Sequence, residues 1–111
     1  YYDSYYTKAQ QVRRQLYEQT KLVFSEIDVL LMPVSPSTAF KIGEKNSNPI
    51  EMYLADIYTV FANLVGVPGI SIPLFQHSNG LPFGLQLMTK HFDEVSLLRL
   101  ADGLLKTYKA S

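Results

Sequence analysis

The sequence predicts an α/β fold in which a mixed β-sheet is flanked by helices. Apolar residues recur with helical spacing in three segments, 4–26, 50–65 and 93–108. Between these segments, three short apolar runs are typical of strands, 28–33, 69–74 and 81–88. The chain of 111 residues is long enough for one domain, so the three strands and the helices are expected to share one core.

Composition limits the classes of function. Ten basic and ten acidic residues cancel, so no strong field favours nucleic acid or a membrane surface. There is no cysteine, which excludes disulfides and thiolate nucleophiles, and no apolar run approaches the length of a membrane span. Charged residues are only 18% of the chain, which indicates a compact domain or a surface that packs against another part of its protein. Because the first residue is Tyr rather than Met, we expect a piece of a longer chain.

The first helix, 4–26, has Asp3 as a suitable N-cap. Its apolar stripe is Tyr5, Ala9, Val12, Leu16 and Val23. Tyrosines cluster at positions 1, 2, 5 and 6, where they could line a ligand pocket, although packing in a core or an interface is the interpretation we favour. In strand 28–33, the continuous apolar run from Val29 to Met32 predicts a strand in the middle of the sheet, buried on both faces.

The segment 33–49 is predicted to be a loop because proline, glycine and small polar residues dominate it. Ser35 and Ser37, with Lys41 and Lys45, raise the possibility of a serine–lysine nucleophile pair. We reject it, because the loop has no glycine-rich backbone that could form an oxyanion hole.

The helix 50–65 is predicted to begin with Asn48 as its N-cap and Pro49 at its first position. Its only charges are Glu51 and Asp56, so we expect the segment to be buried on most sides. A carboxylate in such surroundings is costly unless it meets a cation or several donors. Asp56 is therefore the candidate site residue, as the partner of a ligand ammonium. On the residues alone we favour a structural role, either a local cap at a helix break or a salt bridge within the chain.

A glycine and a proline separate this helix from the strands. Gly66 suits the position after a helix end, and Pro68 prevents the helix from resuming. The Asn79-Gly80 pair predicts a hairpin between the last two strands. Asp93 is expected to cap the last helix, which Gly103 weakens relative to alanine. The two histidines, at positions 77 and 91, lack the acidic neighbours of a metal site.

Several motifs in combination resemble the amidase-signature family, and within it most closely the A subunits of glutamyl-tRNA(Gln) amidotransferases. They are Tyr1 to Arg13, Ala39 to Lys45, Met52-Tyr53-x-x-Asp56-Ile57-x-Thr59, Asn63 to Pro73, Gly80 to Gln86 and Lys90 to Glu94. The chain departs from the family pattern where Phe61 replaces a proline, which favours an unbroken helix, and where Thr89 replaces a glycine. The resemblance implies that residues 1–111 are a C-terminal fragment of one amidase domain.

The resemblance also implies a function. The parent would be the glutaminase subunit of an ATP-dependent ligase complex, hydrolysing glutamine through an acyl-enzyme on serine. Its ammonia would convert Glu-tRNA(Gln) to Gln-tRNA(Gln) in a heterotrimer with subunits B and C. ATP and Mg would be bound in a partner subunit, with no cofactor or metal in this chain, and the location would be cytoplasmic without a membrane. In this family an aspartate that Asp56 matches holds the α-amino group of the substrate glutamine.

The family's catalytic Gly-Gly-Ser-Ser-Gly core is absent from this sequence, so the chain alone is expected to be inactive and to contain no catalytic residue. It would supply one wall of the glutamine pocket through Asp56. Surfaces meant for the rest of the domain would be exposed, so we expect the piece to self-associate. Two alternatives stay open: a fragment of another amidase-signature hydrolase, acting on fatty-acid, aryl or indole amides, and a non-catalytic binding or scaffold module.

Overall fold

The computed structural model describes residues 2–44 and 49–109, and it has the expected α/β class. Tyr1, Lys45 and Asn48, to which the sequence assigned roles, lie outside the described residues. The elements in chain order are α1 (Tyr2–Phe24), β1 (Leu30–Pro33), α2 (Pro49–Ala55), α3 (Val60–Val65), β2 (Gly69–Gln76), β3 (Pro82–Met88) and α4 (Glu94–Lys109).

The three strands form one sheet in the order β1-β3-β2. Both neighbouring pairs are antiparallel, so the described sheet is not mixed as expected: β1 and β2 run in the same direction but β3 separates them. β1 is also not the middle strand. It lies at an edge with Leu31 53% exposed, because β3 occupies the centre and pairs with both neighbours.

The β2–β3 hairpin closes as the Asn79-Gly80 pair predicts. Gly80 adopts a left-handed φ of 86°, which glycine permits without steric cost. The His77 N–H donates to the Leu81 carbonyl at 2.8 Å, and the Leu81 N–H donates to Asn79 Oδ1 at 3.0 Å. Next to the turn, Phe75 lies opposite Phe83, and beyond a register shift between Ile72 and Phe75, Ile70 lies opposite Leu87.

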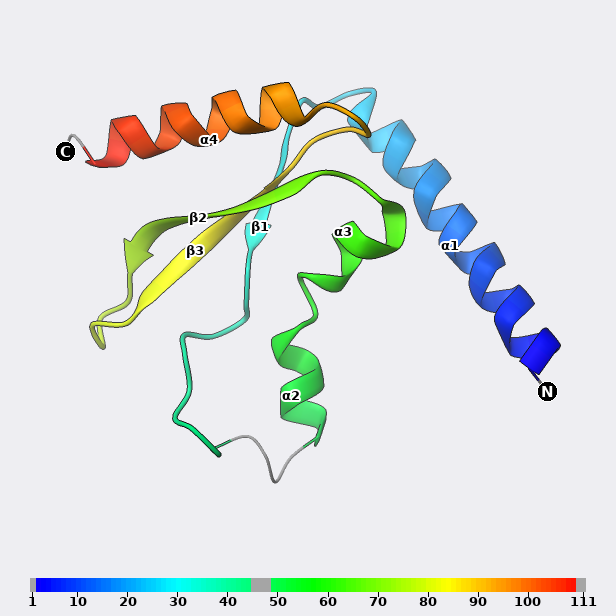
Figure 1. Ribbon diagram of the computed structural model, residues 1–111, viewed down its shortest axis with the longest axis horizontal. Coiled ribbons are helices and arrows are strands. Elements are labelled where there is room, and N and C mark those ends of the chain that lie inside the picture. The colour runs from blue at the N-terminus through cyan, green and yellow to red at the C-terminus, as the bar shows by residue number, and fades with distance from the viewer. Residues whose placement is uncertain (1, 45–48, 110–111) are drawn as a thin grey trace.

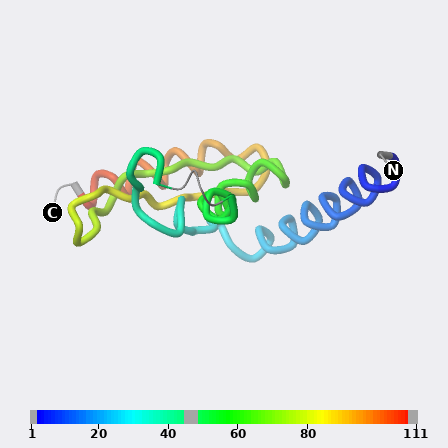
Figure 2. Tube along the Cα trace, turned by 90° about the horizontal axis from the view of Figure 1, so that it is seen from below, coloured from blue at the N-terminus to red at the C-terminus, as the bar shows by residue number. Residues whose placement is uncertain are grey.

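Helices pack on both faces of the sheet (Figure 1). Successive residues of a strand point to opposite faces, so Leu87 and Met88 belong to different cores. On the α4 side the buried cluster is Ile72, Leu87, Leu97 and Ala101. On the α3 side it is Phe24, Val65, Val67 and Met88. The molecule measures 53 × 41 × 17 Å, and α1 extends away from the sheet along the longest dimension (Figure 2).

The expected single helix 50–65 is two helices, α2 and α3, separated by a turn at residues 56–59. The carbonyl of Asp56 accepts bonds from the Thr59 N–H at 3.1 Å, the Thr59 hydroxyl at 3.1 Å and the Val60 N–H at 3.3 Å. A hydroxyl that bonds to a nearby carbonyl offers the backbone an alternative to continued helix. The departure at Phe61 therefore does not produce an unbroken helix.

The expected burial of this segment is also wrong. α2 contains no buried residue, and of α3 only Val65 is buried. In Figure 1, α2 leads away from the sheet beyond α3, so the sheet does not cover it. Tyr5 and Tyr6, near the start of α1, are also outside the described core, at 65% and 51% exposed. No helix among the described residues is both long enough and apolar enough to cross a membrane.

Candidate functional site

Asp56 lies at the start of the turn between α2 and α3, and its side chain is exposed. Within the described ranges, its carboxylate makes no hydrogen bond or ion pair. The internal salt bridge considered as one structural role is therefore absent from the described part of the chain. Asp56 does sit at a helix break, but its carbonyl oxygen, rather than its carboxylate, organises that break.

The turn is tied to the central strand by Gln86. This side chain is 7% exposed, and its Nε2–H donates to the carbonyl of Tyr58 at 2.9 Å. A second amide, that of Asn63 on α3, donates to the carbonyl of Thr59 at 3.1 Å. Sequence reasoning named Gln86 as the end of a family-like motif, Gly80 to Gln86, and missed this contact. The available signal was a polar side chain in an otherwise apolar strand.

Two hollows flank this turn on the sheet face opposite α4. One, of about 250 Å³, has polar walls from Thr59, Asn63, Ser71 and Gln86. The other, also of about 250 Å³, reaches from Ala55 to Ser71 and the start of β3. Asp56 lines neither hollow, but Ala55, directly before it, lines one, and Thr59, three residues after it, lines the other. The two hollows share Val34 and Ser71 as wall residues, so they adjoin on one face of the molecule.

The far end of α3 is held by two side chains from distant segments. Arg13 Nε donates to the Leu64 carbonyl at 2.7 Å, and His91 Nε2 donates to the Val65 carbonyl at 2.7 Å. Gly66 ends the helix in the left-handed conformation at φ 74°, as its position in the sequence predicts. Cationic and polar donors at a helix C-terminus satisfy carbonyls that the helix leaves unpaired.

A hollow of about 430 Å³ opens beside these contacts. The Tyr17 ring lies 4.5 Å from the His91 ring, between centroids, and the Arg14 guanidinium lies 5.0 Å from the Tyr17 ring. His91 is thus part of a packing arrangement. Among the described residues, no group of three His, Asp or Glu side chains could hold a metal ion.

The rejected serine–lysine pair has no geometric support in the described loop. The Ser35 hydroxyl donates to the Ser37 carbonyl at 2.8 Å and accepts from the Ser37 N–H at 3.3 Å. The Lys41 N–H donates to Glu44 at 2.7 Å. These are local turn contacts, and no bond between a serine hydroxyl and a lysine amine occurs within residues 34–44.

A short antiparallel sheet with helices on both faces makes the described residues part of an α/β domain. Residues 1–98 match the family model described as amidase, and the chain belongs to the amidase family. Over 104 residues it is 50% identical to the A subunit of the glutamyl-tRNA(Gln) amidotransferase of Acidobacterium capsulatum, a match that covers 94% of this chain and 22% of that relative.

Two solved structures show the same fold. The crystal structure of the A subunit of the glutamyl-tRNA(Gln) amidotransferase from Thermotoga maritima superposes with a TM-score of 0.85 at 46% identity, over 91% of this chain and 22% of that one. The S177A allophanate hydrolase of Kluyveromyces lactis gives a TM-score of 0.78 at 28% identity, over 89% and 16%. The chain therefore spans about a fifth of the length of the curated relatives it matches.

The position where Thr89 stands in place of a glycine is well accommodated. Thr89 is fully buried, its hydroxyl donates to the Asp93 carbonyl at 2.9 Å, and its N–H donates to the Pro68 carbonyl at 3.2 Å. Both polar groups are thus satisfied, so the larger side chain carries no unpaired donor into the core.

Proposed function

We propose that this chain is part of the glutaminase subunit of a tRNA-dependent amidotransferase, in which it forms one wall of the glutamine pocket. The supporting observation is the 50% identity to the A subunit of such an enzyme over 94% of the chain, against 28% identity to the allophanate hydrolase. In this proposal the parent hydrolyses glutamine, and the released ammonia converts Glu-tRNA(Gln) to Gln-tRNA(Gln) in a complex with subunits B and C. A cytoplasmic location belongs to the proposal because the substrate is a charged tRNA.

Asp56 is the residue of this chain that would contact the substrate. Its exposed carboxylate would accept charge-assisted hydrogen bonds from the α-ammonium of glutamine, which orients the substrate without entering the hydrolytic step. The nucleophile, ATP and Mg would be held elsewhere in the parent protein or its partners. Residues 1–111 alone would therefore bind at most weakly and would not hydrolyse glutamine.

Kinetics of the full-length parent with glutamine and with 4-carbamoylbutanoate, which lacks only the α-amino group, test this role. Asp56→Asn should raise KM for glutamine about 10- to 100-fold, the worth of a hydrogen bond to a charged group, with kcat little changed. The analogue should be hydrolysed equally well by the wild type and the variant.

Asp102→Asn is the matched control, since it makes the same chemical change on α4 at an exposed position. It should leave both substrates unaffected. An unchanged KM for glutamine in Asp56→Asn would remove the site assignment, while the family membership would stand.

A second candidate is another amidase-signature amide hydrolase, which the similarity to the allophanate hydrolase favours. Such an enzyme acting on an amide without an ammonium group would not need a carboxylate at position 56. A parent that hydrolyses neutral aryl or alkyl amides faster than glutamine, with no dependence on Asp56, would support this candidate.

A further inference from the structure

The Gln86 side chain is a buried amide at the centre of the sheet. It is 7% exposed and lies on β3, between Met32 of β1 and Ser71 of β2. A buried primary amide is costly unless its donors are used, and the Nε2–H bond of 2.9 Å to the Tyr58 carbonyl uses one. The partner is 28 residues earlier in the chain, so this bond is a tertiary contact.

The turn that Gln86 contacts has otherwise local bonds. The Asp56 N–H donates to the Tyr53 carbonyl at 3.2 Å, and the Asp56 carbonyl accepts from Thr59 and Val60. Across the described ranges, the Gln86 bond is the hydrogen bond that joins residues 56–59 to the sheet. The turn that carries Asp56 is therefore joined to the central strand by the hydrogen bond of one side chain.

We propose that Gln86 is a positioning residue for the α-ammonium of glutamine. By holding the carbonyl of Tyr58, it would fix the turn so that the Asp56 carboxylate, two residues earlier, lies where the ammonium arrives. A misplacement of about 1 Å at a binding group is enough to weaken orientation of a substrate. This inference rests on the proposed function, because it takes Asp56 to be the group that the ammonium meets.

Removal of the Gln86 amide donor would change the position of the turn rather than the packing of the core. A methionine at position 86 has nearly the same length and leaves the Tyr58 carbonyl without its donor. The hollow of about 250 Å³ beside Gln86, which Thr59 and Ser71 also line, gives the turn room to shift. The kcat/KM for substrates that carry an ammonium would then fall more than the kcat/KM for substrates that lack it.

The test uses the full-length parent enzyme and the ratio of kcat/KM for glutamine to kcat/KM for 4-carbamoylbutanoate. Gln86→Met should lower this ratio about 3- to 10-fold, the usual worth of one hydrogen bond. Gln86→Asn, which keeps an amide but is one methylene shorter, should lower it as well. A merely structural role would lower both kcat/KM values together and leave the ratio unchanged, which would overturn the inference.

Gln76→Met is the matched control. Gln76 of β2 also donates its Nε2–H to a backbone carbonyl, that of Gly80 at 2.7 Å, but in the hairpin turn. The Gln76→Met variant should leave the ratio of the two kcat/KM values unchanged. If both Gln86 variants prove insoluble, Thr59→Val provides a second route, because it removes the hydroxyl bond to the Asp56 carbonyl and should lower the same ratio.

A double variant separates the two proposals. In an Asp56→Asn background, Gln86→Met should change the ratio no further, since the group that it positions is gone. If Asp56→Asn alone leaves the ratio unchanged, the proposed function of Asp56 fails. If Asp56→Asn lowers the ratio and Gln86→Met does not, the positioning role fails while the function of Asp56 stands.

Discussion

His91 donates a hydrogen bond from Nε2 to the carbonyl oxygen of Val65 at 2.7 Å, across 26 residues of sequence. Arg13 reaches the neighbouring carbonyl of Leu64 across 51 residues. Together they place the end of α3 between the first helix and the segment that precedes α4. Because α3 follows directly on the turn that carries Asp56, these contacts also fix one end of the candidate site.

Replacement of His91 by alanine should lower the free energy of unfolding by about 1 kcal/mol, the usual worth of one hydrogen bond. The ring also loses its contact with Tyr17, which adds to the effect. Urea denaturation followed by circular dichroism measures the change. Lys90→Ala, an exposed neighbour, is the control and should have little effect. Equal stability of His91→Ala and the wild type would show that the bond is not a structural support.

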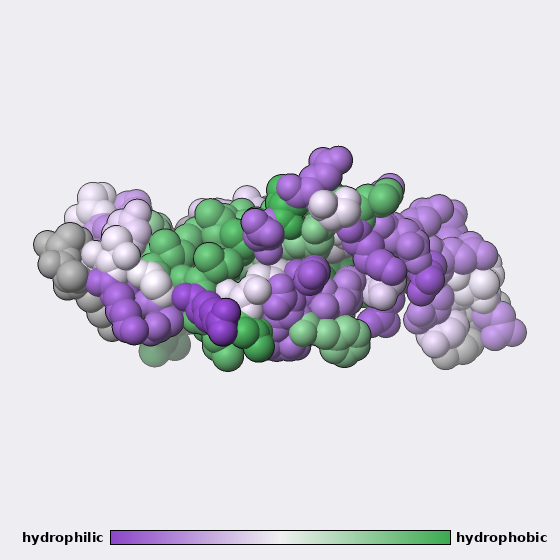
Figure 3. Space-filling view, turned by 90° about the horizontal axis from the view of Figure 1, so that it is seen from above, coloured by the Kyte–Doolittle hydropathy of each residue, from purple (hydrophilic) through white to green (hydrophobic). Residues whose placement is uncertain are grey.

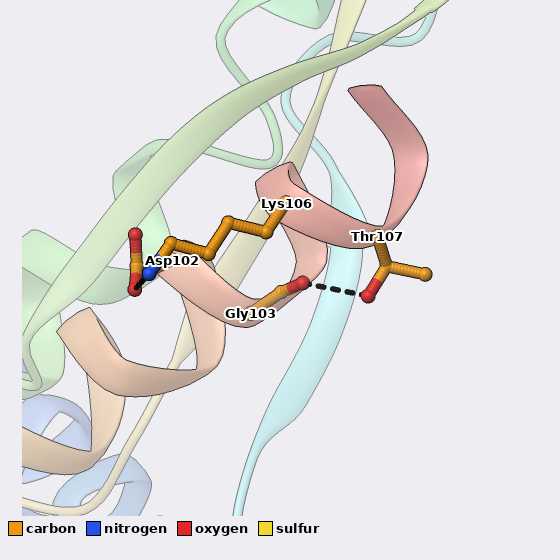
Figure 4. A network of polar contacts seen from close by, with 4 residues as sticks. All are labelled: Asp102, Gly103, Lys106 and Thr107. Carbon is orange, nitrogen blue, oxygen red and sulfur yellow. Dashed lines mark hydrogen bonds and ion pairs between the residues drawn. The ribbon is translucent and has the colours of Figure 1, made fainter. Parts of the chain in front are cut away.

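Gly103 is expected to weaken α4, and the structure shows no need for a glycine there. A Cβ at this position would meet no heavy atom within 4 Å, and its carbonyl accepts the Thr107 hydroxyl at 2.8 Å (Figure 4). Gly103→Ala should therefore stabilise the protein by up to about 1 kcal/mol, raising the melting temperature.

Gly84 is the opposite case, and the same melting experiment tests it. A Cβ there would lie 2.8 Å from Ser71 Oγ, 3.2 Å from the Ile72 carbonyl and 3.3 Å from Val34. Gly84→Ala forces the central strand and its neighbours apart, so the melting temperature should fall. If Gly84→Ala melts no lower than the wild type, this close packing is not rigid.

The ion pair between Lys106 and Asp102 predicts a dependence of stability on alkaline pH (Figure 4). A side-chain hydrogen bond and the charge of Asp102 raise the pKa of Lys106 above its ordinary value of 10.5. A raised pKa in the folded state gives stability that is fully present below the unfolded pKa and is lost as the pH rises through the folded pKa. The effect should be small, since both side chains are mostly exposed.

Melting temperatures of the wild type and Asp102→Asn, measured from about pH 9 to about pH 12, check this sign. The wild type should melt slightly higher at the lower end, and the difference should vanish at the upper end. A difference that grows with pH would contradict the assignment.

Exposed apolar side chains predict that the 111-residue chain self-associates. Figure 3 shows hydrophobic surface gathered over the part of the molecule where α4 lies, while the α1 end is mostly hydrophilic. Val95 and Leu98 of α4 are 61% and 59% exposed, and Phe92 before it is 93% exposed. Leu31 adds an apolar side chain on the edge strand β1. Such surfaces in a monomer mark contacts with other protein parts.

Sedimentation velocity at rising concentration should show species larger than the monomer. Leu31→Lys, which places a charge on the sheet edge, should reduce them, and Gln19→Lys on exposed α1 should not. A single monomeric species that unfolds cooperatively would contradict the prediction.

Local chemistry made much of this fold predictable. Asn79-Gly80 closes the hairpin, Gly66 ends α3, and the Asp93 carboxylate accepts the Ser96 N–H at the start of α4. Each of these depends on residues within a few positions of one another. The sequence also indicated Asp56 as the candidate site residue; its role as a ligand for an ammonium stays a prediction.

Contacts between residues far apart in the sequence, and the burial of each apolar segment, were not predictable in the same way. The turn at residues 56–59 contains the bond from the Thr59 hydroxyl to the Asp56 carbonyl, and Tyr58 of this turn accepts a bond from Gln86, 28 residues away. The burial assigned to the segment 50–65 was too high because apolar composition shows that a surface avoids water, but not which polypeptide covers it. The position of β1 at an edge follows from β3, which lies more than 50 residues later in the chain.

The long sequence separation of these contacts has a consequence for synthesis on the ribosome. The segment bearing Asp56 emerges about thirty residues before Gln86 and His91 do, so it leaves the exit tunnel with neither anchor in place. Nascent chains halted so that the last residue outside the tunnel lies between 66 and 85 should therefore expose α2 and α3 to protease. Once His91 has also left the tunnel, Gln86 of β3 and His91 can form their hydrogen bonds to the α2–α3 segment, which was synthesised earlier. Completion of the candidate site therefore depends on the last third of this chain.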